Sequence, residues 1–249
     1  MTMPGRPSLT ERTSYAPKHK SETFIVPLLA VAISGAIDRY ANGGKALDVG
    51  CGGQPFRSAL QQRGCKYFSL DVNPTPGVAV DFLAPIDGSL PTELIAAGPY
   101  DFILCTEVLE HVADWPHAFE NLAKLLAPGG KLLLTAPHFY FLHEEPYDFF
   151  RPTLHAFAHF AARHNLQVLE SKQLGDAWDI FGTLLSSCRF KPVDDSRLSR
   201  VLAWTLWKLR DFAFRRIQSD SIRRRVNFSG ATYLSNFVVL AAPSNNAFT

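Results

Sequence analysis

Short apolar runs alternate along the chain with longer segments whose apolar residues recur at helical spacing. The short runs are rich in Val, Leu and Phe and are bounded by Gly, Pro or Asp, which is typical of buried strands. The longer segments are typical of amphipathic helices. Predicted strands cover residues 45–50, 66–72, 78–83, 100–106, 131–137, 166–172 and 232–243, and predicted helices cover residues 56–64, 91–98, 115–130 and 151–165.

This alternation predicts the α/β fold class. Strands that are apolar on both sides must be covered on both faces, so the pattern favours a Rossmann-like, doubly wound sheet of seven mostly parallel strands. In open sheets of this kind, ligands bind beyond the carboxyl ends of the strands, where the strand order reverses. We therefore expect the chemistry of this protein in the residues that directly follow each strand.

Additional segments flank or interrupt the predicted sheet. Residues 1–20, rich in Pro, Ser, Thr and Lys, are predicted to form a mobile tail, and residues 21–44 a helix that packs on the domain. The α/β domain is expected over residues 45–245, with a helical insertion at about residues 175–229. Within the insertion, residues 196–218 have apolar side chains at helical spacing and form a predicted amphipathic helix.

The distribution of charge bears on the role of helix 196–218. The whole chain carries a net charge of +2, which favours neither nucleic acid nor membrane as a general partner, and no nucleic-acid partner is expected. Residues 196–225, however, contain nine basic and two acidic residues. We expect the helix to cap the substrate pocket. The alternatives are peripheral contact with an anionic membrane, because basic and Trp-rich faces favour lipid interfaces, and a dimer contact. The oligomeric state is left open.

Cysteine and histidine usage bears on compartment and metal content. The four cysteines form neither a CxxC pair nor a zinc-binding spacing, so we expect reduced thiols in a cytoplasmic protein, with peripheral attachment to the membrane surface as an addition. The stretch HEEPYD (143–148) is not an HExxH motif, and His155 with His159 offers only two ligands. Because zinc sites need three or four convergent ligands, no metal site is expected.

The stretch ALDVGCGGQPF (46–56) ends a predicted strand in a glycine-rich turn. Gly50 and Gly52 allow a tight turn that exposes peptide groups, and the N-terminus of the following helix would face the same ligand. Asp71 ends the second strand, where a carboxylate can accept hydrogen bonds from both ribose hydroxyls. Its alternative role is that of a turn residue.

Asp81 and Phe82 end the third predicted strand, where they would bind an adenine amino group and pack on the base. The alternative is a helix cap beside a core aromatic ring. Pro55 stands where a dinucleotide fingerprint has its third glycine, and the chain has no Walker-type GKS or GKT. A nucleoside ligand without a pyrophosphate fits this pattern best.

Five motifs follow one another along the chain: ALDVGCGG, the acid at Asp71, VDFL, YDFILCTEVLEHV and LLAPGGKLLLTAP. In this order they resemble the class I S-adenosylmethionine-dependent methyltransferases, over residues 45–172 and the closing strand 232–243. HFYFLHEEPYDFFRPT (138–153) further resembles a bacterial subgroup, similar to methyltransferase type 11, with a His-rich loop after the fifth strand. The resemblance implies S-adenosylmethionine as cofactor and a small-molecule, saccharide or lipid-linked acceptor.

The resemblance also implies a complete cofactor site. The backbone of the glycine loop would bind the methionine end, and acids would bind the ammonium group, the ribose and the adenine. The end of the fourth strand would line the sulfonium side of the pocket. In that order, the residues are Gly50 and Gly52, Asp48, Asp71, Asp81 with Phe82, and Thr106 with Glu107.

The loop after the fifth predicted strand supplies the candidate catalytic groups. His143 stands beside two carboxylates and is placed to titrate near neutrality, which suits a general base. Glu144 and Asp148 are the further catalytic candidates. The alternative is that all three are hydrogen-bonded scaffolding, with Arg151 paired to Asp148. Substrate contacts are expected from His111, His138, Tyr147 and Arg151.

Two other functions fit parts of the pattern. One is a methyltransferase-like binding protein without catalysis, which the intact glycine loop and Asp71 disfavour because degenerate copies commonly lose these features. The other is an NAD-dependent oxidoreductase, which the absent third glycine disfavours.

Overall fold

The computed structural model describes residues 14–73, 75–230 and 232–244, so most of the tail predicted for residues 1–20 lies outside the described residues. The strands are β1 (Lys45–Val49), β2 (Lys66–Asp71), β3 (Phe82–Leu83), β4 (Tyr100–Thr106), β5 (Leu126–Pro137), β6 (Gln167–Leu174) and β7 (Ser235–Ala241). The helices are η1 (Lys20–Glu22), α1 (Ile25–Tyr40), α2 (Arg57–Gln62), α3 (Thr92–Ala97), η2 (Leu109–His111), α4 (Trp115–Leu125), α5 (Leu154–Arg163), α6 (Ala177–Ser187) and α7 (Arg197–Gln218).

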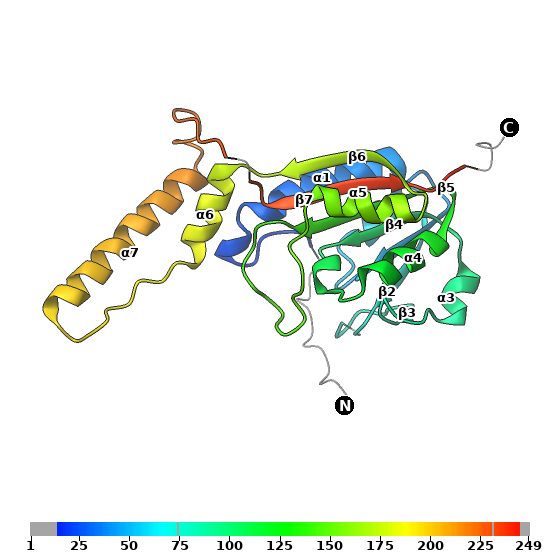
Figure 1. The fold of residues 1–249 in the computed structure, drawn as a ribbon, viewed down its shortest axis with the longest axis horizontal. Helices are drawn as coiled ribbons and strands as arrows, with labels where there is room; N and C mark the ends of the chain where they lie inside the picture. The colour runs from blue at the N-terminus through cyan, green and yellow to red at the C-terminus, as the bar shows by residue number, and fades with distance from the viewer. Residues whose placement is uncertain (1–13, 74, 231, 245–249) are drawn as a thin grey trace.

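These strands form one seven-stranded sheet in the order β3-β2-β1-β4-β5-β7-β6 (Figure 1). β1 pairs in parallel with β2 and β4, and β4 pairs in parallel with β5. β7 runs antiparallel between β5 and β6. The order reverses between β1 and β4, so the switch point lies where the glycine-rich turn leaves β1. The predicted Rossmann-like, mostly parallel sheet is confirmed.

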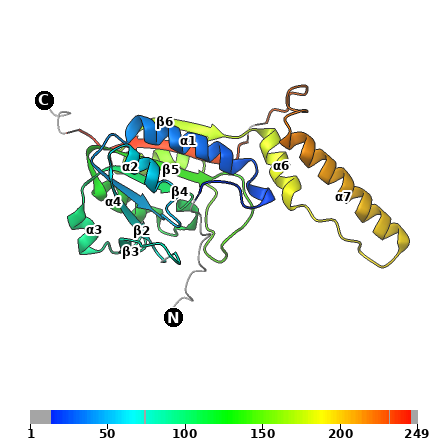
Figure 2. The same ribbon diagram turned by 180° about the vertical axis from the view of Figure 1, so that it is seen from behind.

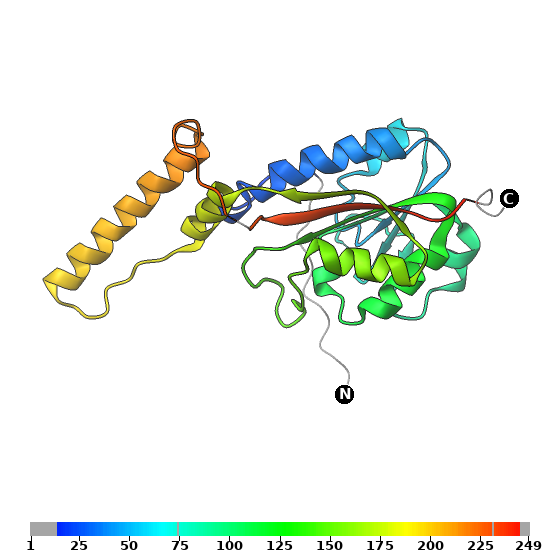
Figure 3. The same ribbon diagram turned by 45° about the horizontal axis from the view of Figure 1, so that its top comes forward.

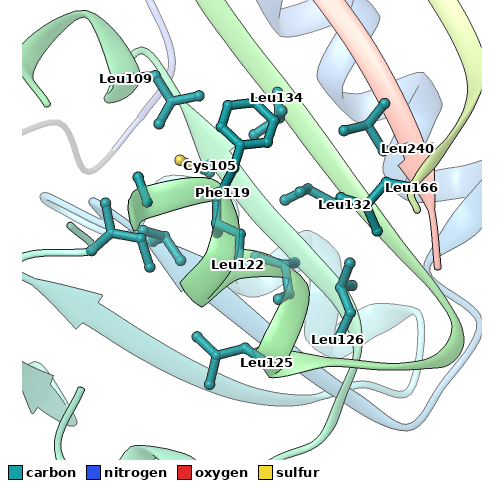
Figure 4. Packing of buried hydrophobic residues seen from close by; sticks show 14 of the residues in the cluster. Cys105, Leu109, Phe119, Leu122, Leu125, Leu126, Leu132, Leu134, Leu166 and Leu240 are labelled. Carbon is teal, nitrogen blue, oxygen red and sulfur yellow. The ribbon is translucent and has the colours of Figure 1, made fainter. Parts of the chain in front are cut away.

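Helices cover both faces of the sheet. α1 and α2 lie on the face that Figure 2 turns toward the viewer, and Figure 3 shows α1 and α5 on opposite sides. On the α4 face, Leu122 and Leu132 belong to one buried cluster (Figure 4). Along β1, Leu47 and Val49 join this cluster whereas Ala46 joins the cluster under α1, because successive strand residues point to opposite faces.

Strand pairing changes the bounds of two predicted elements. α4 ends before Leu126, which pairs with Tyr100 of β4, so the LAPGG stretch at the end of predicted helix 115–130 belongs to β5. β3 keeps only the last two residues of the strand predicted for 78–83. In both places the pairing available in the folded sheet decides the conformation, and the local pattern does not.

The N-terminal helix and the insertion pack against each other. The helix predicted for residues 21–44 is replaced by η1 and the shorter α1, and the insertion contains α6 in addition to the expected α7. A Cβ at Gly182 of α6 would lie 2.4 Å from the ring of Phe24, so glycine permits this close contact. Phe24 also meets Phe214 of α7 edge to face, at 5.7 Å between ring centroids. The rest of α7 extends away from the sheet (Figure 1).

Candidate functional site

A cavity of about 440 Å³, hereafter the main cavity, lies at the carboxyl ends of β1, β4 and β5. Its lining comes from the glycine loop after β1, from residues 106–111 after β4 and from residues 137–144 after β5. Residues 15–29 of the N-terminal segment complete it. The cavity therefore occupies the switch point that the sheet topology predicts.

A smaller cavity of about 50 Å³ adjoins the main cavity on the side of β2 and β3. Its lining includes Asp71 and residues 84–87. Gly50, Glu107 and His111 line both cavities, so the two spaces share a wall.

The glycine loop owes its shape to backbone conformations that favour glycine. Gly50 has φ of +67°, and a Cβ at this position would lie 2.3 Å from Cγ2 of Val108. Gly52 has φ of +46°, yet a Cβ there would meet no atom within 4 Å. Gly50 therefore permits close packing, whereas Gly52 leaves its backbone open to a ligand.

Asp71 holds the glycine loop in place. Its buried carboxylate accepts hydrogen bonds from the amides of Gly52 at 2.9 Å, Val72 at 2.7 Å and Asn73 at 3.2 Å. The Cys51 thiol, with Sγ 3.9 Å from the oxygen that Gly52 also contacts, is a fourth and weaker donor. Asp71 thus combines the turn role with a position in the wall of the smaller cavity.

Asp48 is a buried acid in the lining of the main cavity. Its carboxylate accepts a hydrogen bond of 2.8 Å from the hydroxyl of Tyr67. Burial raises the pKa of Asp48 to about 7, and the nearby charge of Asp71 adds to the shift although the Tyr67 hydrogen bond opposes it. A cationic ligand group beside Asp48 would favour its ionised form.

Asp81 and Phe82, which are expected to bind the adenine, make contacts within the sheet. The Asp81 carboxylate accepts hydrogen bonds from the amide and hydroxyl of Ser69, at 2.9 and 2.8 Å, and so ties β3 to β2. Phe82 stacks on Phe68, with 6.3 Å between ring centroids. Neither residue lines either cavity. Residues 84–87, which follow β3 in the chain, line the smaller cavity.

The end of β4 brings Thr106 and Glu107 into the main cavity, as the resemblance implies. Glu107 has φ of +53°, an uncommon conformation for a residue with a side chain. Its amide donates to the backbone oxygen of Thr135 at 3.0 Å, which fixes this conformation at the edge of β5. Backbone strain of this kind is concentrated at functional sites.

Glu110, which was not among the expected site residues, lies fully buried in the wall of the main cavity. Neither of its carboxylate oxygens has a hydrogen-bond partner. Burial raises the pKa of Glu110 well above its ordinary value, and the negative charges of Glu107 and Glu144 add to this effect. A buried acid without a hydrogen bond is costly, so this position favours a ligand, a proton or a cation.

His111 and His143 meet beside Glu110. Their rings contact edge to face, with 4.8 Å between centroids, and both line the main cavity. His111 Nε2 lies 3.4 Å from a carboxylate oxygen of Glu144 and 3.8 Å from one of Glu110. Of the expected acid-base and substrate residues, His111, His143 and Glu144 are thus brought together.

Asp148 and Arg151 form the scaffold that the sequence left as an alternative. Arg151 donates to both carboxylate oxygens of Asp148, at 2.6 and 2.7 Å, and to the backbone oxygen of Phe141 at 2.8 Å. Burial raises the pKa of Asp148, but hydrogen bonds from Arg151 and from the His143 amide outweigh it and leave the pKa below its ordinary value. Asp148 does not line the main cavity, and its expected catalytic role stays a prediction.

Three expected substrate residues, His138, Tyr147 and Arg151, lie outside the linings of both cavities. The ring of His138 stacks on Tyr233 at 4.2 Å, and its Nδ1 lies 2.9 Å from the Pro152 carbonyl oxygen. Tyr147 contacts His111 through its backbone, with its carbonyl oxygen 2.9 Å from Nδ1 of His111. Arg151 is the scaffold residue described above.

The segment that lines the main cavity differs from the cap expected at residues 196–218. No residue of α6 or α7 lines the main cavity within the described chain. The N-terminal segment takes this place, with Tyr15, Glu22 and Leu29 among the lining residues. The pattern of residues 21–44 predicts a helix but cannot say which cavity it closes. The sequence does contain a sign of Glu110 as a site residue, because this acid directly precedes His111 in EVLEHV.

Comparison with known proteins identifies the family. A family model described as a methyltransferase domain matches residues 29–235. A ubiquinone biosynthesis O-methyltransferase of Pseudomonas aeruginosa is 33% identical over 104 residues, which cover 37% of this chain and 44% of that protein. The chain thus matches less than half the length of these curated relatives.

Solved structures share the fold at low identity. Coclaurine N-methyltransferase, bound to N-methylheliamine and S-adenosylhomocysteine, has a TM-score of 0.52 at 15% identity, covering 92% of this chain and 76% of that one. Phosphoethanolamine N-methyltransferase 2 of Haemonchus contortus, in complex with S-adenosylmethionine, has a TM-score of 0.50 at 16% identity, covering 84% and 52%. The methyltransferase-domain match over residues 29–235 contradicts the NAD-dependent alternative. The chain belongs to the methyltransferase-domain family, the class I methyltransferases that depend on S-adenosylmethionine.

Proposed function

We propose that this protein transfers the methyl group of S-adenosylmethionine to a polar atom of an amphiphilic, lipid-linked acceptor at an anionic membrane surface. The observation that carries the proposal is an exposed apolar stripe on α7. α7 packs with α6 against η1 and Phe24 of the N-terminal segment. This segment also lines the main cavity.

The cofactor end of the site fits the family's cofactor. Asp48 would hold its ammonium group beside the open backbone of Gly52, and Asp71 would accept from the ribose in place of the weak Cys51 thiol donor. Residues 84–87 would enclose the adenine in the smaller cavity. The bound sulfonium supplies an already reactive methyl group, so the protein contributes chiefly proximity and alignment.

The acceptor end of the main cavity combines apolar and polar surface. Ile25, Val26 and Leu29 of α1 line it together with Leu142 of the loop after β5, whose side chain is largely exposed. His143, Glu144 and the nearby His111 add polar groups to the same lining. A few polar groups within an apolar lining select a ligand with one reactive polar atom on an apolar body.

The exposed stripe on α7 recurs at helical spacing. Its members are Leu198, Leu202, Leu209 and Phe212, whose exposed fractions are 78%, 56%, 59% and 53%. α7 buries a different set of side chains, those of Ala203, Phe214 and Ile217. A contiguous apolar patch on a protein surface marks an interaction site.

Charge favours an anionic lipid surface as the occupant of the stripe. Residues 196–225 carry nine basic and two acidic residues, and Arg197, Lys208 and Arg215 flank the stripe at helical spacing. Within the described residues, no helix is long and apolar enough to span a bilayer. α7 would therefore lie on the surface, where a lipid-linked acceptor is at hand.

Vesicle sedimentation tests the docking. The protein should pellet with phosphatidylcholine vesicles that contain about 30% phosphatidylserine, and salt should release it because screening weakens the attraction. Leu202→Glu should lower the bound fraction several-fold. Val31→Glu is the matched control, since Val31 is an exposed apolar residue of α1 at 77% exposure. Equal binding to pure phosphatidylcholine, or a concentration-dependent dimer that Leu202→Glu abolishes, would contradict the proposal.

Methyl transfer is tested separately. With S-adenosylmethionine labelled in the methyl group, label should enter the organic phase of a bacterial lipid extract that is incubated with the protein. Label confined to the aqueous phase would contradict a lipid-linked acceptor. The absence of transfer to any fraction, despite cofactor binding, would favour the binding protein without catalysis.

A further inference from the structure

Three residues of the main cavity place ligand atoms close together. One side-chain atom each of Glu110, His111 and His143 lies within 4.8 Å of the other two. Glu110 and His111 come from η2, and His143 comes from the loop after β5. All three line the main cavity beside the end of β4.

Glu110 supplies an independent sign that a ligand belongs here. Its side chain is fully buried, and both carboxylate oxygens lack a hydrogen-bond partner. Buried polar groups in folded proteins are nearly always paired, so each exception needs an explanation. A cation bound between Glu110 and the two histidines would pair with this carboxylate.

The hydrogen bonds of the two histidines orient their rings for such a role. Nδ1 of His111 lies 2.9 Å from the Tyr147 carbonyl oxygen, and Nδ1 of His143 lies 3.0 Å from that of Phe141. Nδ1 of His143 also lies 3.3 Å from a carboxylate oxygen of Asp148 and 3.4 Å from Nη2 of Arg151. In the tautomer that donates from Nδ1 to the carbonyl oxygen, each ring has its lone pair on Nε2. Metal-binding histidines are typically fixed in this way.

We propose that Glu110, His111 and His143 bind a divalent metal ion of the zinc type, which holds the acceptor oxygen. Two imidazoles with one carboxylate suit Zn²⁺, Co²⁺ or Fe²⁺ better than Mg²⁺ or Ca²⁺, which prefer oxygen ligands. Glu144 stands nearby, with φ of +57° and a carboxylate oxygen 3.4 Å from Nε2 of His111. The position of the cluster in the cavity wall leaves the ion open to an acceptor.

The site would activate an acceptor hydroxyl group. A bound cation lowers the pKa of a coordinated hydroxyl, so its proton leaves to Glu144 or water at neutral pH. The oxygen then forms a bond to the methyl carbon, the carbon–sulfur bond breaks, and its electron pair returns to sulfur. The inference rests on the proposed function only for this acceptor chemistry, since the metal site itself is independent of the acceptor.

Cobalt binding tests the site without an activity assay. After dialysis against a chelator, the protein should bind a single Co²⁺ ion with a visible ligand-field absorption band, and Zn²⁺ should displace it. His143→Ala and Glu110→Gln should each weaken binding by about tenfold or more. Glu145→Gln is the control because Glu145 is exposed on the same loop and lies outside the cluster.

Two results would overturn the proposal. One is an unmodified protein that binds no Co²⁺ or Zn²⁺, and the other is equal metal affinity in His143→Ala, Glu110→Gln and the unmodified protein. S-adenosylhomocysteine binding reports whether each variant is folded. Vesicle binding through α7 should not respond to the chelator, so failure of the metal site and failure of the lipid-docking proposal are distinguishable.

Discussion

The two ends of the main cavity are built by different means. At the cofactor end, the chain itself forms the site: glycine conformations shape the loop, and the Asp71 carboxylate is held by three backbone amides. At the acceptor end, side chains from η2 and the loop after β5 converge, and one of them, Glu110, is buried without a hydrogen-bond partner.

The difference teaches which residues can be read from local sequence. The shape of the cofactor end depends on residues that are close together in the chain, such as Gly50 and Gly52, so it can be recognised in the sequence as a short motif. A side-chain-built end depends on contacts between distant residues, such as His111 and His143, and has no compact motif. Single substitutions at the two ends are therefore expected to differ in their effects on turnover and on cofactor affinity.

The largest effect is expected at the acceptor end. His143→Ala should lower kcat by about 10²–10³-fold, because an acid-base or metal-binding group at the reacting atom is lost. Affinity for S-adenosylhomocysteine should stay within about twofold, since the cofactor end is backbone-built. Steady-state kinetics and calorimetry measure both quantities. His138→Ala, whose ring packs on Tyr233, is the control. Joint loss of cofactor binding and turnover would make His143 scaffolding.

An intermediate effect is expected at Asp71. Asp71→Ala should weaken cofactor binding by about 1.5–3 kcal/mol, the range for hydrogen bonds to a charged group. Asp71→Asn should lose less, because it keeps one acceptor oxygen for the loop amides. Calorimetry on both variants gives the values. An unchanged affinity in folded Asp71→Ala protein would remove Asp71 from the cofactor site.

The smallest effect is a pH dependence at Asp48. Burial raises its pKa to about 7 in the cofactor-free protein, so Asp48 gains its proton as the pH falls below 7. A cationic ammonium group binds the charged form, and the affinity for S-adenosylmethionine should fall by up to about tenfold per pH unit below 7. The affinity should level off above that pH. Asp48→Asn should flatten the titration curve. A curve with the same slope in Asp48→Asn would assign the dependence to another group.

Much of the fold could be predicted because its elements are local patterns that agree with the global arrangement. The strands around Leu47 and Ile103 are mainly apolar, and burial on both faces follows from this. The errors occur where a tertiary contact competes with a local signal. Leu126 pairs with Tyr100 although its sequence continues a helix, and α6 is present although its pattern is short.

The candidate site divides in the same way. The sequence by itself determined the Rossmann-like sheet, the glycine loop and the acids Asp48 and Asp71, because short-range conformation and strand order place them. Tertiary structure decided that Asp81 ties two strands together and that Glu110 is buried beside His143. It also decided that the N-terminal segment, and not α7, encloses the cavity. The physical reason is that amphipathic periodicity shows only that one face of a helix must be buried. The packing of the folded chain decides against which surface that face is buried.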